Sequence, residues 1–251
     1  MSSLIAFNFI GYILITHQTN MKNILKSGQA VFDIEVPYKL IETGSSSNEK
    51  PLIIYLHGFN QNMEQFEKLV APMLDLNAYH LFVQGPYPIY DRRRKKKVED
   101  WGRSWYLYDG EQDQFVKSLE SASGFLENLI QDILRQITAS RVAVFGYSMG
   151  GYLAGYFALS RPKLIDELMV VGARIKTEVF EGDERRYDTM NVLALHGTRD
   201  KSVKSEPQQK SCEQLSEWGA QVTFKEMDRA HKLDNIYLKK TREWLKSLGY
   251  N

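Results

Sequence analysis

A serine flanked by glycines lies near the middle of the chain, in the sequence Gly-Tyr-Ser-Met-Gly at residues 146–150. Residues 141–145 are mostly apolar and favour extended backbone, and residues 151–160 carry apolar side chains at helical spacing. Strand, tight turn and helix form the setting in which Gly-x-Ser-x-Gly presents a reactive serine. Neighbours without a Cβ do not collide across so sharp a turn. We therefore predict that Ser148 is a nucleophile; the alternative is an ordinary Gly/Ser loop between two core elements.

A nucleophilic serine needs a base and an orienting acid, and candidates for both follow Ser148 along the chain. A serine hydroxyl is a weak nucleophile at neutral pH until a neighbouring base takes its proton. His231 is the predicted base, and Asp200 is predicted to orient its imidazole and stabilise the cation. The order serine, acid, histidine is the one that accompanies this turn. Two other histidines lie at the ends of predicted strands, and we do not expect either to be the base. His57 is expected to brace a loop, and His196 is expected to pack or to bind backbone.

Acyl transfer also requires two hydrogen-bond donors for the oxygen that becomes negatively charged. The backbone N–H of the residue after the nucleophile supplies one donor, and that residue is Met149. The second donor is expected from the loop after the apolar run at residues 52–56. Phe59 is placed for this role, because Gly58 before it allows the backbone to approach a substrate closely. The sequence therefore predicts an oxyanion hole built from the backbone of Phe59 and Met149.

Strands and helices alternate along the chain, which predicts an α/β fold with a mostly parallel sheet covered on both faces. Strands are expected at 31–43 (two short edge strands or one bent strand), 52–56, 81–84, 141–145, 168–171, 192–195 and 222–226. Helices are expected at 63–74, 112–137, 151–160, 206–218 and 234–248. Functional loops in such sheets lie at the carboxyl ends of the strands. The loops at 57–62, 146–150, 196–200 and 228–231 should therefore meet at one edge.

Length and composition fit one sizeable core, so we expect a single domain over residues 31–251 and an N-terminal extension at 1–30. Lys and Arg total 32 and Asp and Glu total 31, a net charge of +1 that gives no indication of a nucleic-acid partner. The single cysteine, Cys212, excludes an intrachain disulfide and fits a reducing compartment, so we expect a cytoplasmic location. No spacing of cysteine and histidine suggests a metal site.

Two stretches leave alternatives open. Residues 4–15 are mostly apolar but too short to span a bilayer as a helix. They fit a packed or frayed extension, a start assigned upstream of a true initiator at Met21, or a membrane-associated segment. Residues 92–97 are six consecutive basic residues, which fit a solvated loop or a region that attracts anionic substrates or a membrane surface.

Four motifs together resemble the phospholipase/carboxylesterase group of α/β hydrolases, which includes acyl-protein thioesterases and small bacterial carboxylesterases. They are Ile54-Tyr55-Leu56-His57-Gly58-Phe59, Phe145-Gly146-Tyr147-Ser148-Met149-Gly150-Gly151, His196-Gly197-Thr198-Arg199-Asp200 and Ala230-His231. The resemblance runs from about residue 50 to the C-terminus and implies an α/β-hydrolase fold. It also implies hydrolysis of an acyl ester or thioester without a cofactor, with the residue roles given above. Trp105 and Tyr106 resemble an aromatic pair of some relatives, which implies contact with substrate. From the residues alone, the aromatic side chains at 101–108 fit either the core or one wall of an acyl pocket.

Two other functions remain alternatives. A serine peptidase on the same fold would share the nucleophilic turn and its partners, although a chain of 251 residues leaves little room for a domain that sorts peptides. A binding protein that uses an inactive hydrolase fold would have no need of the ordered serine, acid and histidine. The sequence leaves the acyl chain length, the leaving group, the oligomeric state and membrane association undetermined.

Overall fold

The computed structural model describes residues 24–251 except residues 29, 31–32, 46–48 and 183–186. The chain divides into two compact units, residues 1–33 and 34–251. All described helices and strands lie within the second unit. The alternatives raised for the apolar stretch at residues 4–15 fall outside the described residues.

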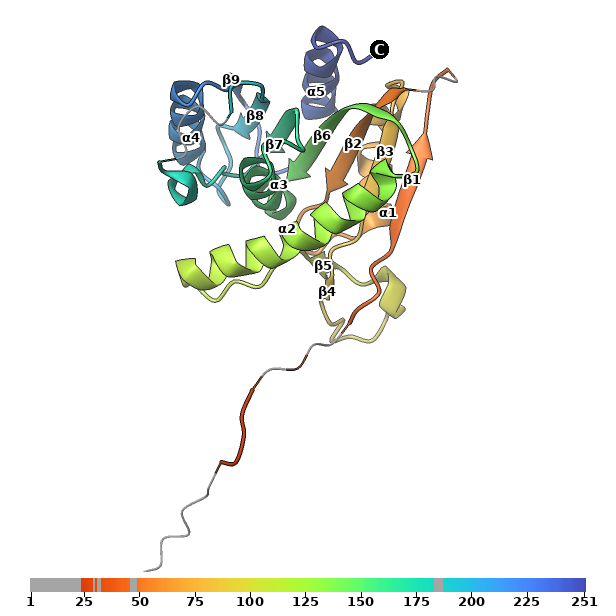
Figure 1. Ribbon diagram of the computed structural model, residues 1–251, viewed down its shortest axis with the longest axis vertical. Helices are drawn as coiled ribbons and strands as arrows, with labels where there is room; N and C mark the ends of the chain where they lie inside the picture. The colour runs from red at the N-terminus through yellow and green to blue at the C-terminus, as the bar shows by residue number, and fades with distance from the viewer. Residues whose placement is uncertain (1–23, 29, 31–32, 46–48, 183–186) are drawn as a thin grey trace, which may run out of the picture. The chain divides into compact units, whose positions relative to one another are not determined.

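A seven-stranded sheet forms the centre of the second unit, with the strand order β1-β3-β2-β6-β7-β8-β9 (Figure 1). The strands are β1 Tyr38–Glu42, β2 Lys50–Leu56, β3 Tyr79–Val83, β6 Ala139–Tyr147, β7 Glu167–Val171, β8 Asn191–Gly197 and β9 Gln221–Met227. β1 is antiparallel to β3, and every other pairing in this sheet is parallel. The predicted mostly parallel sheet is therefore confirmed. β6 lies in the middle of this order and leads directly into Ser148.

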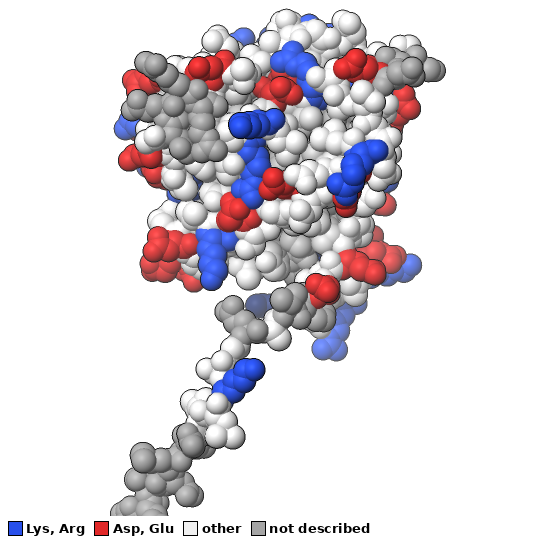
Figure 2. All heavy atoms as spheres, viewed as in Figure 1, with Lys and Arg blue, Asp and Glu red and all other residues white. Residues whose placement is uncertain are grey.

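Helices cover both faces of the sheet (Figure 1). They are α1 Met63–Leu69, α2 Gln112–Leu134, α3 Met149–Ser160, α4 Ser205–Glu217 and α5 Asn235–Ser247. Successive side chains of a strand point to opposite faces. Leu52 and Ile54 of β2 therefore pack in the core shared with α2, α3 and α4, whereas Ile53 and Tyr55 pack in the core shared with α1 and α5. On the face drawn in Figure 2, acidic and basic side chains are mixed, in keeping with the small net charge.

One expected helix is broken in the structure. Residues 63–74 were expected to form a single helix, but α1 ends at Leu69 and a 3-10 helix, η1, follows at Ala71–Asp75. Pro72 explains the break, because proline lacks a backbone N–H and its ring collides with the carbonyl of the preceding turn. Gly124, by contrast, does not interrupt α2.

Among the described residues, no helix is both long and apolar enough to cross a bilayer.

A second, small sheet was not expected from the sequence. β4 Tyr87–Pro88 pairs antiparallel with β5 Arg103–Ser104. Proline in a strand is confined to edges, and this two-stranded ribbon consists only of edges. The ribbon brings residues on either side of the 89–102 loop next to each other, which matters for the site described below.

His80 in β3 gives the fold a predictable dependence on pH. Its Nδ1 lies 2.9 Å from the Tyr55 hydroxyl and its Nε2 lies 2.9 Å from Thr43 Oγ1, inside the core. Burial lowers the pKa of His80 from 6.5 to about 4, so the unfolded chain binds a proton that the folded chain does not. The free energy of unfolding should therefore fall as the pH drops from about 6.5 to about 4. We expect His80→Gln to reduce this drop by on the order of 3 kcal/mol, measured by urea unfolding at several pH values. Identical pH dependence in the variant would contradict this account.

Candidate active site

Ser148 lies at the tip of a sharp turn between β6 and α3. Its backbone has φ 51° and ψ −118°, a positive-φ conformation that residues other than glycine rarely adopt. The chain closes tightly around it: a Cβ at Gly146 would collide with the Gly150 carbonyl, and one at Gly150 would collide with the Leu56 carbonyl. The Ser148 N–H donates to the Val171 carbonyl at 2.9 Å, which ties the turn to the neighbouring strand. Glycine therefore occupies the two positions of the turn where another part of the backbone lies too close to leave room for a Cβ.

The structure brings Ser148, His231 and Asp200 together from three separate loops. Ser148 Oγ lies 2.8 Å from His231 Nε2, and His231 Nδ1 lies 2.6 Å from Asp200 Oδ2. Asp200 follows β8 and His231 follows β9, so the parallel strands deliver both to the edge where β6 ends. Tyr147 stacks on the imidazole with ring centroids 5.6 Å apart, and its hydroxyl donates to the His231 carbonyl at 3.3 Å. This arrangement allows a proton to move from the hydroxyl to the imidazole.

Asp200 is held as a buried carboxylate. Burial alone would raise the pKa of Asp200, but the donors around it prevail and lower the pKa below its ordinary value. The backbone N–H groups of Ser202 and Val203 donate to Oδ1 at 2.8 and 2.9 Å, and His231 bonds to Oδ2. His196 bonds to the Val203 carbonyl at 2.8 Å, while its Nε2 lies 3.7 Å from Asp200 Oδ2. His196 therefore braces the loop that carries the acid.

His57 braces the opposite loop. Its Nδ1 bonds to the Gly58 carbonyl at 2.8 Å, and its Nε2 accepts the Gly85 N–H at 3.0 Å. Accepting that N–H requires a neutral ring, and burial correspondingly lowers the pKa of His57 to about 4. The Trp105 indole N–H donates to the His57 carbonyl of the same loop at 2.8 Å. The loop that carries Phe59 is therefore fixed by buried hydrogen bonds.

Phe59 and Met149 present backbone donors beside the serine. Both residues line the same cavity as Ser148. Among the described residues, neither backbone N–H has a hydrogen-bond partner. Met149 begins α3, and the first N–H groups of a helix have no partner within the helix. Two unpaired backbone donors next to a serine are suited to stabilising a developing oxyanion.

A cavity of about 500 Å³ opens beside Ser148. Its wall is formed by Phe59, Tyr87, Pro88, Ile89, Ser104, Tyr106, Leu107, Tyr108, Ser148, Met149 and Tyr152. The wall is mostly aromatic and aliphatic, which suits an apolar acyl group. Tyr106, an expected substrate contact, belongs to this wall. Trp105 does not: it is fully buried against His57, so the cavity gives no support to a substrate contact there.

Several residues of the cavity wall were not predicted from the sequence. Tyr152 lies in the first turn of α3, only four residues after Ser148, and this closeness in sequence could have identified it. Tyr87 and Pro88 belong to the wall because of the β4–β5 ribbon, which no pattern in the sequence predicts. Leu107, which was not predicted, follows the same ribbon. Tyr108 follows it too, and a place in a pocket wall was one of the two expectations for the aromatic residues at 101–108.

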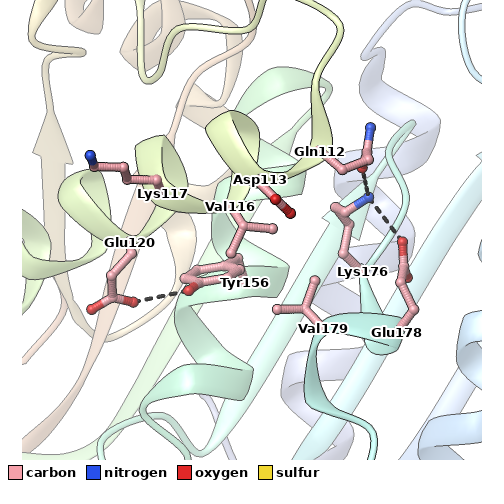
Figure 3. A pocket seen from close by; sticks show the side chains of 9 residues that line it. All are labelled: Gln112, Asp113, Val116, Lys117, Glu120, Tyr156, Lys176, Glu178 and Val179. Carbon is pink, nitrogen blue, oxygen red and sulfur yellow. Dashed lines mark hydrogen bonds and ion pairs between the residues drawn. The ribbon is translucent and has the colours of Figure 1, made fainter.

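A second cavity, of about 630 Å³, lies between α2, α3 and the 3-10 helix η3 at Thr177–Phe180 (Figure 3). Its polar side chains bond mainly to one another. Lys176 Nζ donates to Gln112 Oε1 at 2.7 Å and pairs with Glu178 at 2.9 Å, and the Tyr156 hydroxyl donates to Glu120 at 3.1 Å. The residues that line this cavity include no serine, cysteine or histidine. Within the described part of the chain, no group of three or more histidine, cysteine, aspartate or glutamate residues could hold a metal ion.

Solved structures with the same fold include several esterases. A carboxylesterase from Bacillus cereus is 17% identical over 84% of this chain and 94% of its own, with a TM-score of 0.69. A carboxylesterase from Mesorhizobium loti is 18% identical over 86% and 97%, with a TM-score of 0.68. Acyl-protein thioesterase 2 from Zea mays is 17% identical over 84% and 98%, with a TM-score of 0.64. At these identities the likeness establishes the fold.

The sequence itself establishes the family. A comparison with curated proteins gives no match. The family model of the phospholipases and carboxylesterases matches residues 38–248, which contain all the strands of the sheet and the three side chains joined by hydrogen bonds at its edge. The chain therefore belongs to the phospholipase/carboxylesterase family and is an α/β hydrolase.

Proposed function

We propose that this protein hydrolyses carboxylic esters or thioesters through an acyl-enzyme intermediate, on a single hydrolase domain spanning residues 31–251. Ser148 is the nucleophile, His231 the general base and then acid, and Asp200 the residue that orients His231. The observation that carries this proposal is the pair of hydrogen bonds, 2.8 and 2.6 Å long, that link the three side chains at the cavity. The names of the similar structures, carboxylesterases and an acyl-protein thioesterase, support it.

The reaction follows from this geometry in two halves. His231 Nε2 takes the Ser148 proton as Oγ attacks the carbonyl carbon, and the backbone N–H groups of Phe59 and Met149 stabilise the oxyanion. The protonated imidazole then donates to the leaving alcohol or thiol, which leaves the acyl group on Oγ. Water, deprotonated by His231, then adds to the acyl carbonyl. The tetrahedral intermediate collapses with cleavage of the bond to Oγ, which releases the carboxylic acid as His231 returns the proton to Ser148. Asp200 remains ionised throughout, in keeping with its lowered pKa.

The cavity favours a small or medium acyl group. Its volume of about 500 Å³ and its aromatic wall suit burial of an alkyl chain next to Ser148. We expect purified protein to hydrolyse p-nitrophenyl esters and matching acyl thioesters with an optimum at short to medium chain length. A peptidase would instead cleave aminoacyl amides faster than esters. A binding protein would turn over neither, and its Ser148 would not react with a fluorophosphonate probe.

Tyr106 should help set that optimum. Its side chain is buried, lines the cavity and packs on Phe115 with ring centroids 4.9 Å apart. Tyr106→Ala enlarges the cavity, so KM should rise about tenfold for the ester that fills the native cavity and fall for longer chains. Tyr106→Phe is the matched control, because it keeps the ring and should keep the native optimum. An unchanged chain-length profile in Tyr106→Ala, with the fold intact by circular dichroism, would remove Tyr106 from the acyl site.

A further inference from the structure

The 89–102 loop is an ordered projection rooted in the wall of the active-site cavity. Its stem is the β4–β5 ribbon, extended by a hydrogen bond of 2.8 Å from the Ile89 N–H to the Gly102 carbonyl. Tyr90 and Trp101 meet edge to face above the stem, with centroids 5.0 Å apart. The Asp91 carboxylate accepts the backbone N–H groups of residues 93, 95 and 96 at 3.2, 2.8 and 3.0 Å. We call this projection the basic hairpin.

The basic hairpin carries a concentrated, mostly unpaired positive charge. Residues 92–97 are six lysines and arginines, and all six are exposed. Of these six side chains, only Lys97 forms an ion pair with another described residue, Glu99, at 3.5 Å. Asp91, Glu99 and Asp100 are the acidic residues of the hairpin, so its net charge is six minus three, or +3, against +1 for the whole chain. In Figure 2, blue side chains project at the lower edge of the folded unit, where Figure 1 draws this loop.

Exposed apolar side chains surround the same place. Five large hydrophobic side chains, each more than half exposed, are Phe59, Tyr90, Val98, Leu107 and Tyr108. Phe59, Leu107 and Tyr108 line the cavity beside Ser148, whereas Tyr90 and Val98 belong to the basic hairpin. A cluster of exposed apolar residues next to a binding cavity indicates a contact surface.

We propose that this face docks on an anionic lipid bilayer, with the basic hairpin at the headgroups and the apolar rim of the cavity in the interface. Lysine and arginine clusters are attracted to anionic headgroups, and tyrosine and phenylalanine side chains favour the boundary between headgroups and acyl chains. A free phosphate would use the positive charge alone and leave the five apolar side chains in water. A nucleic acid could stack bases on the aromatic rings but would still leave Val98 and Leu107 in water. If the function proposed above holds, docking lets an acyl substrate pass from the bilayer into the cavity.

Vesicle binding by the full chain tests the docking surface, with the charge of the basic hairpin as the variable. Wild type should sediment with vesicles of phosphatidylcholine and phosphatidylserine, should bind poorly to phosphatidylcholine alone, and should be released by salt. The triple variant Arg93→Gln, Lys95→Gln, Lys96→Gln removes the net charge of the hairpin but keeps the backbone that Asp91 holds. Each basic residue strengthens binding about fivefold, so the triple variant should bind on the order of 100-fold more weakly.

A matched control loses the same charge elsewhere. Lys210, Lys239 and Lys246 are exposed on α4 and α5, and their triple change to glutamine should bind within a few-fold of wild type. Equal losses in both triple variants, or equal binding to neutral and anionic vesicles, would overturn the proposal. Val98→Ser tests the apolar contribution and should weaken binding several-fold; no effect would indicate a soluble anionic ligand instead of a bilayer.

Binding and catalysis are separated by two further measurements. Vesicle binding measured in the Ser148→Ala background requires no turnover, so it tests the surface even if the proposed reaction is wrong. The basic triple variant should hydrolyse a water-soluble p-nitrophenyl ester at the wild-type rate but an ester embedded in anionic vesicles more slowly. Equal rates on the embedded ester would exclude substrate delivery from the bilayer.

Discussion

Ser148→Ala should lower kcat for p-nitrophenyl esters by about 10⁵- to 10⁶-fold and leave a residual rate of about 10³-fold over water. The side chain that attacks the carbonyl is lost, while the backbone donors of Phe59 and Met149 and the cavity remain to bind substrate. KM should change little, because alanine removes one atom from a cavity of about 500 Å³. The rates of both proteins are measured under saturating substrate, with thermal unfolding as a check on the fold.

Ser160→Ala is the matched control, at the other end of the same helix. Its hydroxyl donates to the Phe157 carbonyl at 3.1 Å and has no part in the cavity beside Ser148. Activity should stay at the wild-type level in this variant. A fluorophosphonate probe should label Ser148 alone in wild type, as read by mass spectrometry of the digested protein. Full esterase activity in Ser148→Ala would exclude the proposed nucleophile.

Much of the fold follows from local patterns. The apolar run at residues 52–56 predicts a strand covered on both faces, and its side chains are indeed almost fully buried, split between two cores. Alternating strands and helices then predict parallel pairing, and parallel strands present their carboxyl ends at one edge. For that reason the sequence alone predicts that the loops around Ser148, Asp200 and His231, which are distant along the chain, meet at one edge of the sheet.

The cavity wall could not be predicted in the same way, because it depends on a ribbon formed by tertiary contacts. β4 and β5 contain two residues each and have no periodicity of their own. Ser104, the last residue of β5, and Tyr106 reach the cavity, while Trp105 between them is buried against His57. An aromatic pair in the sequence does not reveal which member faces substrate. The orientation of these side chains depends on the backbone hydrogen bonds that join Arg103 of the ribbon to Asn60 and Gln61 in the 57–62 loop.

Asp200→Asn should lower kcat by about 10⁴-fold while changing the shape of the site very little. Asparagine fills the same volume, and its carbonyl oxygen still accepts the N–H groups of Ser202 and Val203. The negative charge beside His231 disappears, however, so the imidazolium formed during attack is no longer stabilised. An amide N–H facing Nδ1 also favours the tautomer that keeps the proton on Nε2, where it blocks acceptance of the serine proton. The pH dependence of kcat for wild type and variant reports both effects.

Asp228→Asn separates this role from general electrostatics near the histidine. Asp228 lies three residues before His231, but it is exposed and pairs with Arg199 at 2.6 Å. Removing its charge should leave kcat within about twofold of wild type, because exposed ion pairs are weak and screened. A large loss in Asp228→Asn together with a small loss in Asp200→Asn would transfer the orienting role to the exposed residue. The buried carboxylate 2.6 Å from Nδ1, with its lowered pKa, is the reason to expect the opposite outcome.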